Sequence, residues 1–103
     1  MYTVLIVEDE LLVSAGLKSM VHWADMDMAV IGEARNGKQG LEKYRQLKPD
    51  MILTDIKMPV MDGLEMITQI RKEDTETRII VLTCYEEFDL VRQAFKLGIS
   101  DYI

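Results

Sequence analysis

Five short apolar runs, separated by segments with helical spacing, constrain this chain more than any other feature of its sequence. They predict strands at residues 3–7, 29–34, 51–54, 79–83 and 101–103. Strands that alternate with helices form parallel sheets with right-handed crossovers and helices on both faces, so the strands are apolar throughout. The run VLIV at 4–7 and the run IIVL at 79–82 have this character. The sequence therefore predicts one α/β domain over residues 1–103, with a doubly wound parallel sheet.

The connecting segments carry apolar residues at helical spacing. On the first of them, the face expected to pack on the sheet consists of Val13, Leu17, Met20 and Val21. Gly16 is expected to let this helix approach the sheet closely. A second helix is predicted from Asn36, a third after the N-cap Asp62, and a fourth that ends at Gly98. Met66, Ile67 and Ile70 are the apolar contacts expected of the third helix.

Composition and charge exclude several classes of function. The net charge is −6 and the 12 Lys and Arg residues are scattered, which argues against direct nucleic-acid binding by this segment. No apolar run approaches the roughly 18 residues of a membrane span, and no signal-peptide pattern is present. The single cysteine, Cys84, has no partner for an internal disulfide, and no Cys/His cluster for zinc surrounds it. A reducing cytoplasm is the expected location.

Polar residues follow three of the predicted strands. The first strand leads to Glu8 and Asp9, the third to Asp55, and the fourth to Thr83. In open α/β sheets, ligands bind outside the carboxyl ends of the strands. Taken singly, each of these residues is most often a turn former or a helix cap. Together, three carboxylates at one edge repel one another and must bind protons or a cation, and an all-oxygen site favours Mg²⁺.

Four segments resemble the receiver domain of two-component response regulators: LIVEDE at 5–10, LTDIKMPVMDG at 53–63, VLTCYEEFD at 81–89 and GISDYI at 98–103. The resemblance implies a flavodoxin-like, five-stranded sheet of order 2-1-3-4-5. It implies that Asp55 accepts a phosphoryl group. The Mg²⁺ ligands would be Asp9, Asp55 and the backbone carbonyl of Lys57, with Glu8 acting through water.

The resemblance also assigns a switch and partners. Thr83 would move toward the phosphoryl group and Tyr102 would then shift from exposed toward buried, while Lys57 and Tyr85 would tune how long the phosphoryl group survives. The expected donor is a phosphohistidine on a sensor histidine kinase, and the expected output is a DNA-binding domain for transcription regulation, of the AraC type. The only chemistry would be on the domain itself. Neither membrane nor nucleic-acid contact by this segment is expected, and homodimerisation stays open.

Two departures from the family pattern accompany the match. Many receivers have Asp where this chain has Glu8, whose longer side chain is expected to alter metal geometry. Receivers also carry a lysine and a fifth helix after the fifth strand, whereas this sequence ends at Ile103. We expect the 103 residues to be a receiver domain cut before both features, with apolar surface left uncovered on one face of the sheet.

Two other functions remain open from the sequence. A Mg²⁺-dependent phosphatase of the haloacid dehalogenase type also uses an Asp nucleophile after an apolar strand, but carries a second Asp two residues later, where this chain has Lys57. A flavodoxin-like nucleotide-binding module is the third option, although neither phosphate-binding glycine motif is present.

Overall fold

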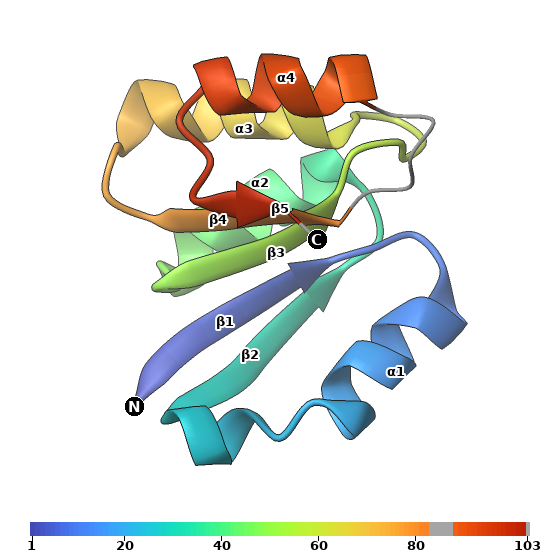
Figure 1. Cartoon of the computed structure of the whole chain (residues 1–103), viewed down its shortest axis with the longest axis vertical. Helices are drawn as coiled ribbons and strands as arrows, with labels where there is room; N and C mark the ends of the chain where they lie inside the picture. Colours follow the sequence, from blue (N-terminus) through green and yellow to red (C-terminus); the bar gives the residue numbers. More distant parts are fainter. Residues whose placement is uncertain (83–87, 103) are drawn as a thin grey trace.

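The structure, a computed structural model, describes residues 1–82 and 88–102, and for residues 88–91, 101 and 102 it describes the backbone alone. The elements in chain order are β1 (Tyr2–Val7), α1 (Leu11–Met20), the 3₁₀ helix η1 (Trp23–Met26), β2 (Met28–Ala34), α2 (Gly37–Leu47), β3 (Met51–Asp55), α3 (Gly63–Glu73), β4 (Arg78–Leu82), α4 (Phe88–Lys96) and β5 (Asp101–Tyr102). All strand pairs are parallel, in the order β2-β1-β3-β4-β5 (Figure 1). The predicted fold class and strand order are confirmed.

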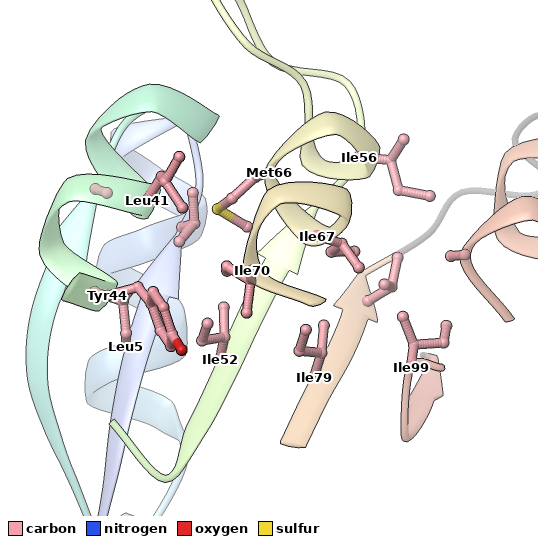
Figure 2. Packing of buried hydrophobic residues seen from close by; sticks show 14 residues of the cluster. Leu5, Leu41, Tyr44, Ile52, Ile56, Met66, Ile67, Ile70, Ile79 and Ile99 are labelled. Atoms are coloured by element: carbon pink, nitrogen blue, oxygen red, sulfur yellow. The ribbon is translucent and has the colours of Figure 1, made fainter. Parts of the chain in front are cut away.

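The larger hydrophobic core lies between the sheet and helices α2, α3 and α4. Figure 2 shows Leu5, Ile52 and Ile79 of neighbouring strands pointing toward Tyr44 of α2 and toward helix α3. The three apolar residues predicted for the third helix, Met66, Ile67 and Ile70, are completely buried in this core. Because the strands are covered here along most of their length, the sheet and helix α3 form one rigid platform.

Two helices begin where the sequence indicates, and for the same physical reason. Asn36 precedes α2 and its side chain accepts a hydrogen bond from the Gln39 amide at 2.9 Å. Asp62 precedes α3 and accepts from the Glu65 amide at 2.8 Å. Each cap satisfies an amide that has no partner inside its helix. These caps place the start of α2 and of α3 at the carboxyl edge of the sheet.

The predicted sheet-facing side of the first helix is wrong in part. Val13 is 39% exposed and Met20 is 80% exposed, whereas the completely buried residue of α1 is Ser14. The Ser14 hydroxyl donates to Glu33 on the edge strand β2, at 2.7 Å, and this polar contact sets which side of α1 turns inward. Leu17 from the predicted face does pack on the sheet. A Cβ atom on Gly16 would meet only the Met20 sulfur, at 3.9 Å, so this glycine gives no close approach to the sheet.

The face of the sheet that carries α1 is covered less completely. A second apolar cluster contains Val4, Ile6, Met51 and Leu53, and Trp23 packs against it. An apolar groove of about 260 Å³ adjoins this cluster, and its lining includes Trp23, Leu53 and Ile80. Open apolar surface on one face agrees with the expectation from the sequence. No helix within residues 1–82 and 88–102 has the length and hydrophobicity needed to cross a bilayer.

Buried and exposed apolar residues should differ in their contribution to the free energy of unfolding. Replacing Ile67 with Ala removes a completely buried side chain from the larger core and should lower the free energy of unfolding by about 3 kcal/mol. Replacing Leu12 with Ala is the matched control, because this side chain is 88% exposed, and it should change stability by less than about 0.5 kcal/mol. Urea denaturation of both variants measures the difference, and equal losses would contradict the assignment of the core.

Candidate functional site

Three carboxylates converge at the carboxyl edge of the sheet. Strands β1 and β3 are neighbours, with Val7 paired to Thr54, so the residues that follow them lie side by side. One carboxylate oxygen from each of Glu8, Asp9 and Asp55 lies within 4.8 Å of the other two. The convergence expected from the sequence is therefore present for these three residues, which we call the acidic cluster.

Burial makes the acidic cluster electrostatically expensive. Glu8 is only 3% exposed, and its Oε2 atom is the one buried side-chain oxygen or nitrogen among the described residues that has no hydrogen-bond partner. Desolvation by burial and, after it, the negative charge of Asp55 together raise the pKa of Glu8 from 4.5 to about 8. Near neutral pH, Glu8 therefore holds a proton unless a cation takes the place of that proton.

The backbone around Asp55 holds its carboxylate in a fixed direction. Asp55 Oδ1 accepts a hydrogen bond from the Ile56 amide at 2.7 Å, and the Gly63 amide donates to the Ile56 carbonyl at 2.6 Å. A Cβ atom at Gly63 would clash with the Asp55 carbonyl oxygen, and only movement of the backbone could relieve that clash. Glycine at this position thus lets the start of α3 lie directly against Asp55.

The loop from Asp55 to α3 contains a strained residue. Val60 has φ of +70°, which a β-branched residue rarely adopts, and it lies in a tight turn in which the Met61 amide donates to the Pro59 carbonyl at 2.8 Å. The Met61 carbonyl in turn accepts from the Gly37 amide at 2.7 Å, at the start of α2. The tight turn and this contact fix the loop between two helix N-termini, beside Asp55.

A charged network beside the acidic cluster was not expected from the sequence. Glu33 of β2 accepts hydrogen bonds from Ser14 at 2.7 Å, from Lys18 at 2.9 Å and from Arg35 at 3.2 Å. These partners, with Ser14 and Lys18 first, lower the pKa of Glu33 to about 2. Two sequence spacings are consistent with the network: Ser14 and Lys18 are four apart on a helix, and Glu33 and Arg35 are two apart at the end of a strand.

The remaining predicted site residues are placed less completely. Lys57 lies in the loop two residues after Asp55, with its side chain exposed. Thr83 and Tyr85 lie outside the described residues. Tyr102 is in β5, where its backbone pairs with Val81 of β4, and its side chain is not described. The roles assigned to these four residues stay predictions.

The acidic cluster fits a small divalent cation. Its donors are all carboxylate oxygens, which Mg²⁺ prefers, and Mg²⁺ typically takes one or two carboxylates and keeps several waters. The buried Glu8 oxygen without a partner is the feature that a bound cation or a water on that cation would satisfy. The geometry also leaves Asp55, which is half-buried, accessible to a reacting group.

The raised pKa of Glu8 predicts how the stability of the metal-free chain depends on pH. Between pH 4.5 and about 8 the folded chain holds a proton on Glu8 that the unfolded chain releases, so the contribution of Glu8 to stability is fully present below pH 4.5 and is lost as pH rises through about 8. The loss attributable to Glu8 is up to about 5 kcal/mol. Chemical denaturation in EDTA at pH 5 and pH 8 measures it. Glu8→Gln should remove most of the decrease, and an unchanged decrease would contradict the assignment.

Strain at Val60 predicts a gain in stability on substitution. Val60→Gly should raise the free energy of unfolding by about 0.5–1 kcal/mol, because relief of the positive φ exceeds the greater flexibility that glycine gives the unfolded chain. Val60→Ala is the control, since alanine keeps most of the strain and should change stability by less than about 0.5 kcal/mol. Thermal unfolding of the two variants is the measurement, and a loss of stability in Val60→Gly would argue that the turn is not strained.

Comparison with known proteins identifies the family. Residues 4–103 match the family described as the response regulator receiver domain. Transcriptional regulatory protein YdfI of Bacillus subtilis (strain 168) is 46% identical over 103 residues, which are 100% of this chain and 47% of that protein. This chain spans less than half the length of several regulatory proteins that it matches.

Solved structures agree with this match. The REC domain of AraT, a response regulator from Geobacillus stearothermophilus, has a TM-score of 0.93 and 32% identity, over 99% of this chain and 79% of that one. A chain of the CheX-CheY-BeF3-Mg+2 complex from Borrelia burgdorferi has a TM-score of 0.88 and 26% identity, over 99% of this chain and 76% of that one. The protein described here belongs to the response regulator receiver domain family.

Proposed function

We propose that Asp55 accepts a phosphoryl group and that Glu8, Asp9 and Asp55 hold the Mg²⁺ that this transfer requires. Receiver domains are regulatory domains of phosphorylation-dependent signalling, and the proposal starts from the membership of this chain in that family. The observation that carries it is the acidic cluster, whose oxygens lie within 4.8 Å of one another and include a buried oxygen without a partner. The Mg²⁺ in the related CheX-CheY-BeF3-Mg+2 complex supports the choice of metal.

The proposed reaction is transfer from a phosphohistidine to Asp55. A carboxylate oxygen of Asp55 attacks phosphorus in line with the bond from phosphorus to the histidine nitrogen, which breaks as the new phosphorus–oxygen bond forms. The imidazole leaves with the electron pair and takes up a proton, and Asp55 becomes an acyl phosphate. Bound Mg²⁺ supplies positive charge that neutralises the carboxylate and the incoming phosphoryl oxygens.

The residues of this chain contribute orientation and charge. The Ile56 amide fixes one Asp55 oxygen by its hydrogen bond, which limits rotation of the acceptor carboxylate. Glu8 would hold the metal through water, Asp9 directly, and Lys57 through its backbone carbonyl. Thr83 and Tyr102 would respond to the new phosphoryl group by the switch motion implied by the resemblance, and Lys57 and Tyr85 would tune its lifetime.

Exposed leucines beside the acidic cluster support docking of a kinase. Receiver domains interact with histidine kinases. In this chain Leu11 is 67% exposed and Leu12 is 88% exposed, at the start of α1 and directly after the acidic segment 8–10 that follows β1. Neighbouring apolar side chains on a surface commonly mark sites of protein contact. We propose that the phosphohistidine of a sensor kinase reaches Asp55 while its carrier packs on this end of α1.

We propose that the output of the switch is regulation of transcription. The support is that YdfI is a transcriptional regulatory protein of about twice this length. An output domain of the AraC type, a cytoplasmic location and homodimerisation stay predictions. So does the extent of the domain: a fifth helix, if it follows residue 103, would have the apolar groove beside Trp23 as its packing surface.

The phosphatase alternative lacks a supporting observation. The residue two positions after Asp55 is Lys57, which cannot serve as the second carboxylate of that enzyme class. Membership of the receiver family also favours self-phosphorylation over turnover of a phosphate ester. Repeated hydrolysis of such an ester by the purified chain would reverse this preference.

Labelling with a small phosphoryl donor tests the proposed function. Acetyl phosphate with Mg²⁺ should add about 80 Da to the intact chain, and hydroxylamine should remove the adduct because it is an acyl phosphate. Asp55→Asn should abolish labelling, whereas Asp25→Asn, which changes a carboxylate that is 79% exposed, should leave it unchanged. An adduct that persists in Asp55→Asn, or that forms equally in EDTA, would contradict the assignment.

A further inference from the structure

Arg35 contacts the backbone that carries two residues of the acidic cluster. Its guanidinium lies just beyond the end of β2 and donates to the backbone carbonyl of Glu8 at 3.2 Å. The same guanidinium donates to Glu33 Oε1, also at 3.2 Å. The Glu8 carbonyl belongs to the peptide unit that joins Glu8 to Asp9. Arg35 therefore touches the metal site through backbone, and not through a carboxylate of the acidic cluster.

The Arg35 side chain is itself held in place by its neighbours. Glu33, its acceptor, is fixed by the buried Ser14 hydroxyl at 2.7 Å and by Lys18 at 2.9 Å, both on α1. The Arg35 amide donates to Gln39 Oε1 of α2 at 3.0 Å. The Glu33 carboxylate, itself held from α1, thus restricts the Arg35 guanidinium, while the Gln39 contact from α2 fixes the Arg35 backbone, and this restriction is the condition for a residue that positions another.

The Glu8–Asp9 peptide unit lies between the end of strand β1 and the start of helix α1, outside both elements. The β1–β2 pairing ends with Val7 and Ala34, and one further backbone hydrogen bond follows, from the Glu8 amide to the Ala34 carbonyl at 2.9 Å. Helix α1 starts only at Leu11, and the side chain of its N-cap residue Glu10 makes no capping hydrogen bond. Repulsion within the acidic cluster acts to turn this short segment away from Asp55. A donor on the Glu8 carbonyl opposes that rotation.

We propose that Arg35 is a positioning residue of the metal site, which holds the Glu8–Asp9 peptide so that both carboxylates continue to face Asp55. This inference rests on the proposed function, because it assumes that the acidic cluster binds Mg²⁺. The positioning role and the positive charge of Arg35 predict opposite effects on the affinity for Mg²⁺ when Arg35 is replaced. A positive charge near the cluster weakens binding of a cation, so loss of Arg35 would tighten Mg²⁺ binding if charge were its only effect. If Arg35 positions the Glu8–Asp9 peptide, its loss should instead weaken Mg²⁺ binding.

Titration of the full chain with MgCl₂, followed by ¹H–¹⁵N NMR, separates the two effects. Three variants are compared with the unchanged chain: Arg35→Met removes charge and donors, Arg35→Lys keeps the charge without the two-pronged geometry, and Arg45→Met is the matched control. Arg45 lies in the last turn of α2, where it forms an ion pair with Glu73 at 2.6 Å. The Asp9 amide reports on the hydrogen bond, because its nitrogen is bonded to the Glu8 carbonyl carbon.

The expected result is that Mg²⁺ binds about tenfold more weakly to both Arg35 variants, while Arg45→Met stays within about twofold of the unchanged chain. The Asp9 amide should also shift in both Arg35 variants before Mg²⁺ is added. Binding that is unchanged or tighter in Arg35→Lys and Arg35→Met would overturn the positioning role. If Arg35→Met does not fold, as judged from its amide dispersion, Arg35→Lys alone decides. An unchanged chain that shows no saturable Mg²⁺ shifts would overturn the proposed function and, with it, this inference.

Discussion

Repulsion among three carboxylates at one edge of the sheet is the constraint on which the rest of this structure depends. Hydrophobic packing of β1 against β3 forces Glu8 and Asp9 to meet Asp55, because the strands are parallel and in register. Two unit charges about 4 Å apart repel by roughly 1 kcal/mol in water and about 4 kcal/mol at an effective dielectric constant of 20. The chain withstands this repulsion through backbone contacts, and one proton on Glu8 relieves part of it.

The two faces of the sheet differ in how completely the helices cover them. On the face covered by α2 and α3, completely buried residues such as Tyr44 and Ile67 pack against the strands and fix the position of β3. On the other face, α1 is attached largely by polar contacts to Glu33 and by Leu17, and much apolar surface stays open. A rigid platform thus presents Asp55, while exposed leucines lie at the site where the proposed kinase partner would dock.

The sequence predicts the fold well because hydrophobic periodicity and cap chemistry are local properties. The strands differ from their predicted bounds by about a residue where the structure describes them, and Asn36 and Asp62 start their helices as expected. The acidic cluster was also foreseeable, since parallel strands bring their carboxyl ends together. The burial of Glu8 and its unpartnered oxygen were not, because they depend on how tightly the surrounding chain closes.

Failures of the prediction have one physical origin, which is tertiary contact between polar groups. Val13 and Met20 fit a helical apolar face, yet Ser14 is buried instead because it bonds to Glu33 on a strand 19 residues away. The sequence does not predict a role for Arg35, because the spacing of Arg35 to Glu33 gives no information about its contact with the Glu8 carbonyl. Such contacts can be identified only once the fold is known, and here they occur next to the acidic cluster.

The central claim is that a divalent cation takes the place of the proton on Glu8. Isothermal titration of the chain with Mg²⁺ at pH 7, in two buffers of different ionisation enthalpy, counts the protons released on binding. The account predicts about one proton per Mg²⁺ bound in the unchanged chain, and close to none in Glu8→Gln. Binding of Mg²⁺ without proton release in the unchanged chain, or no binding at all, would contradict it.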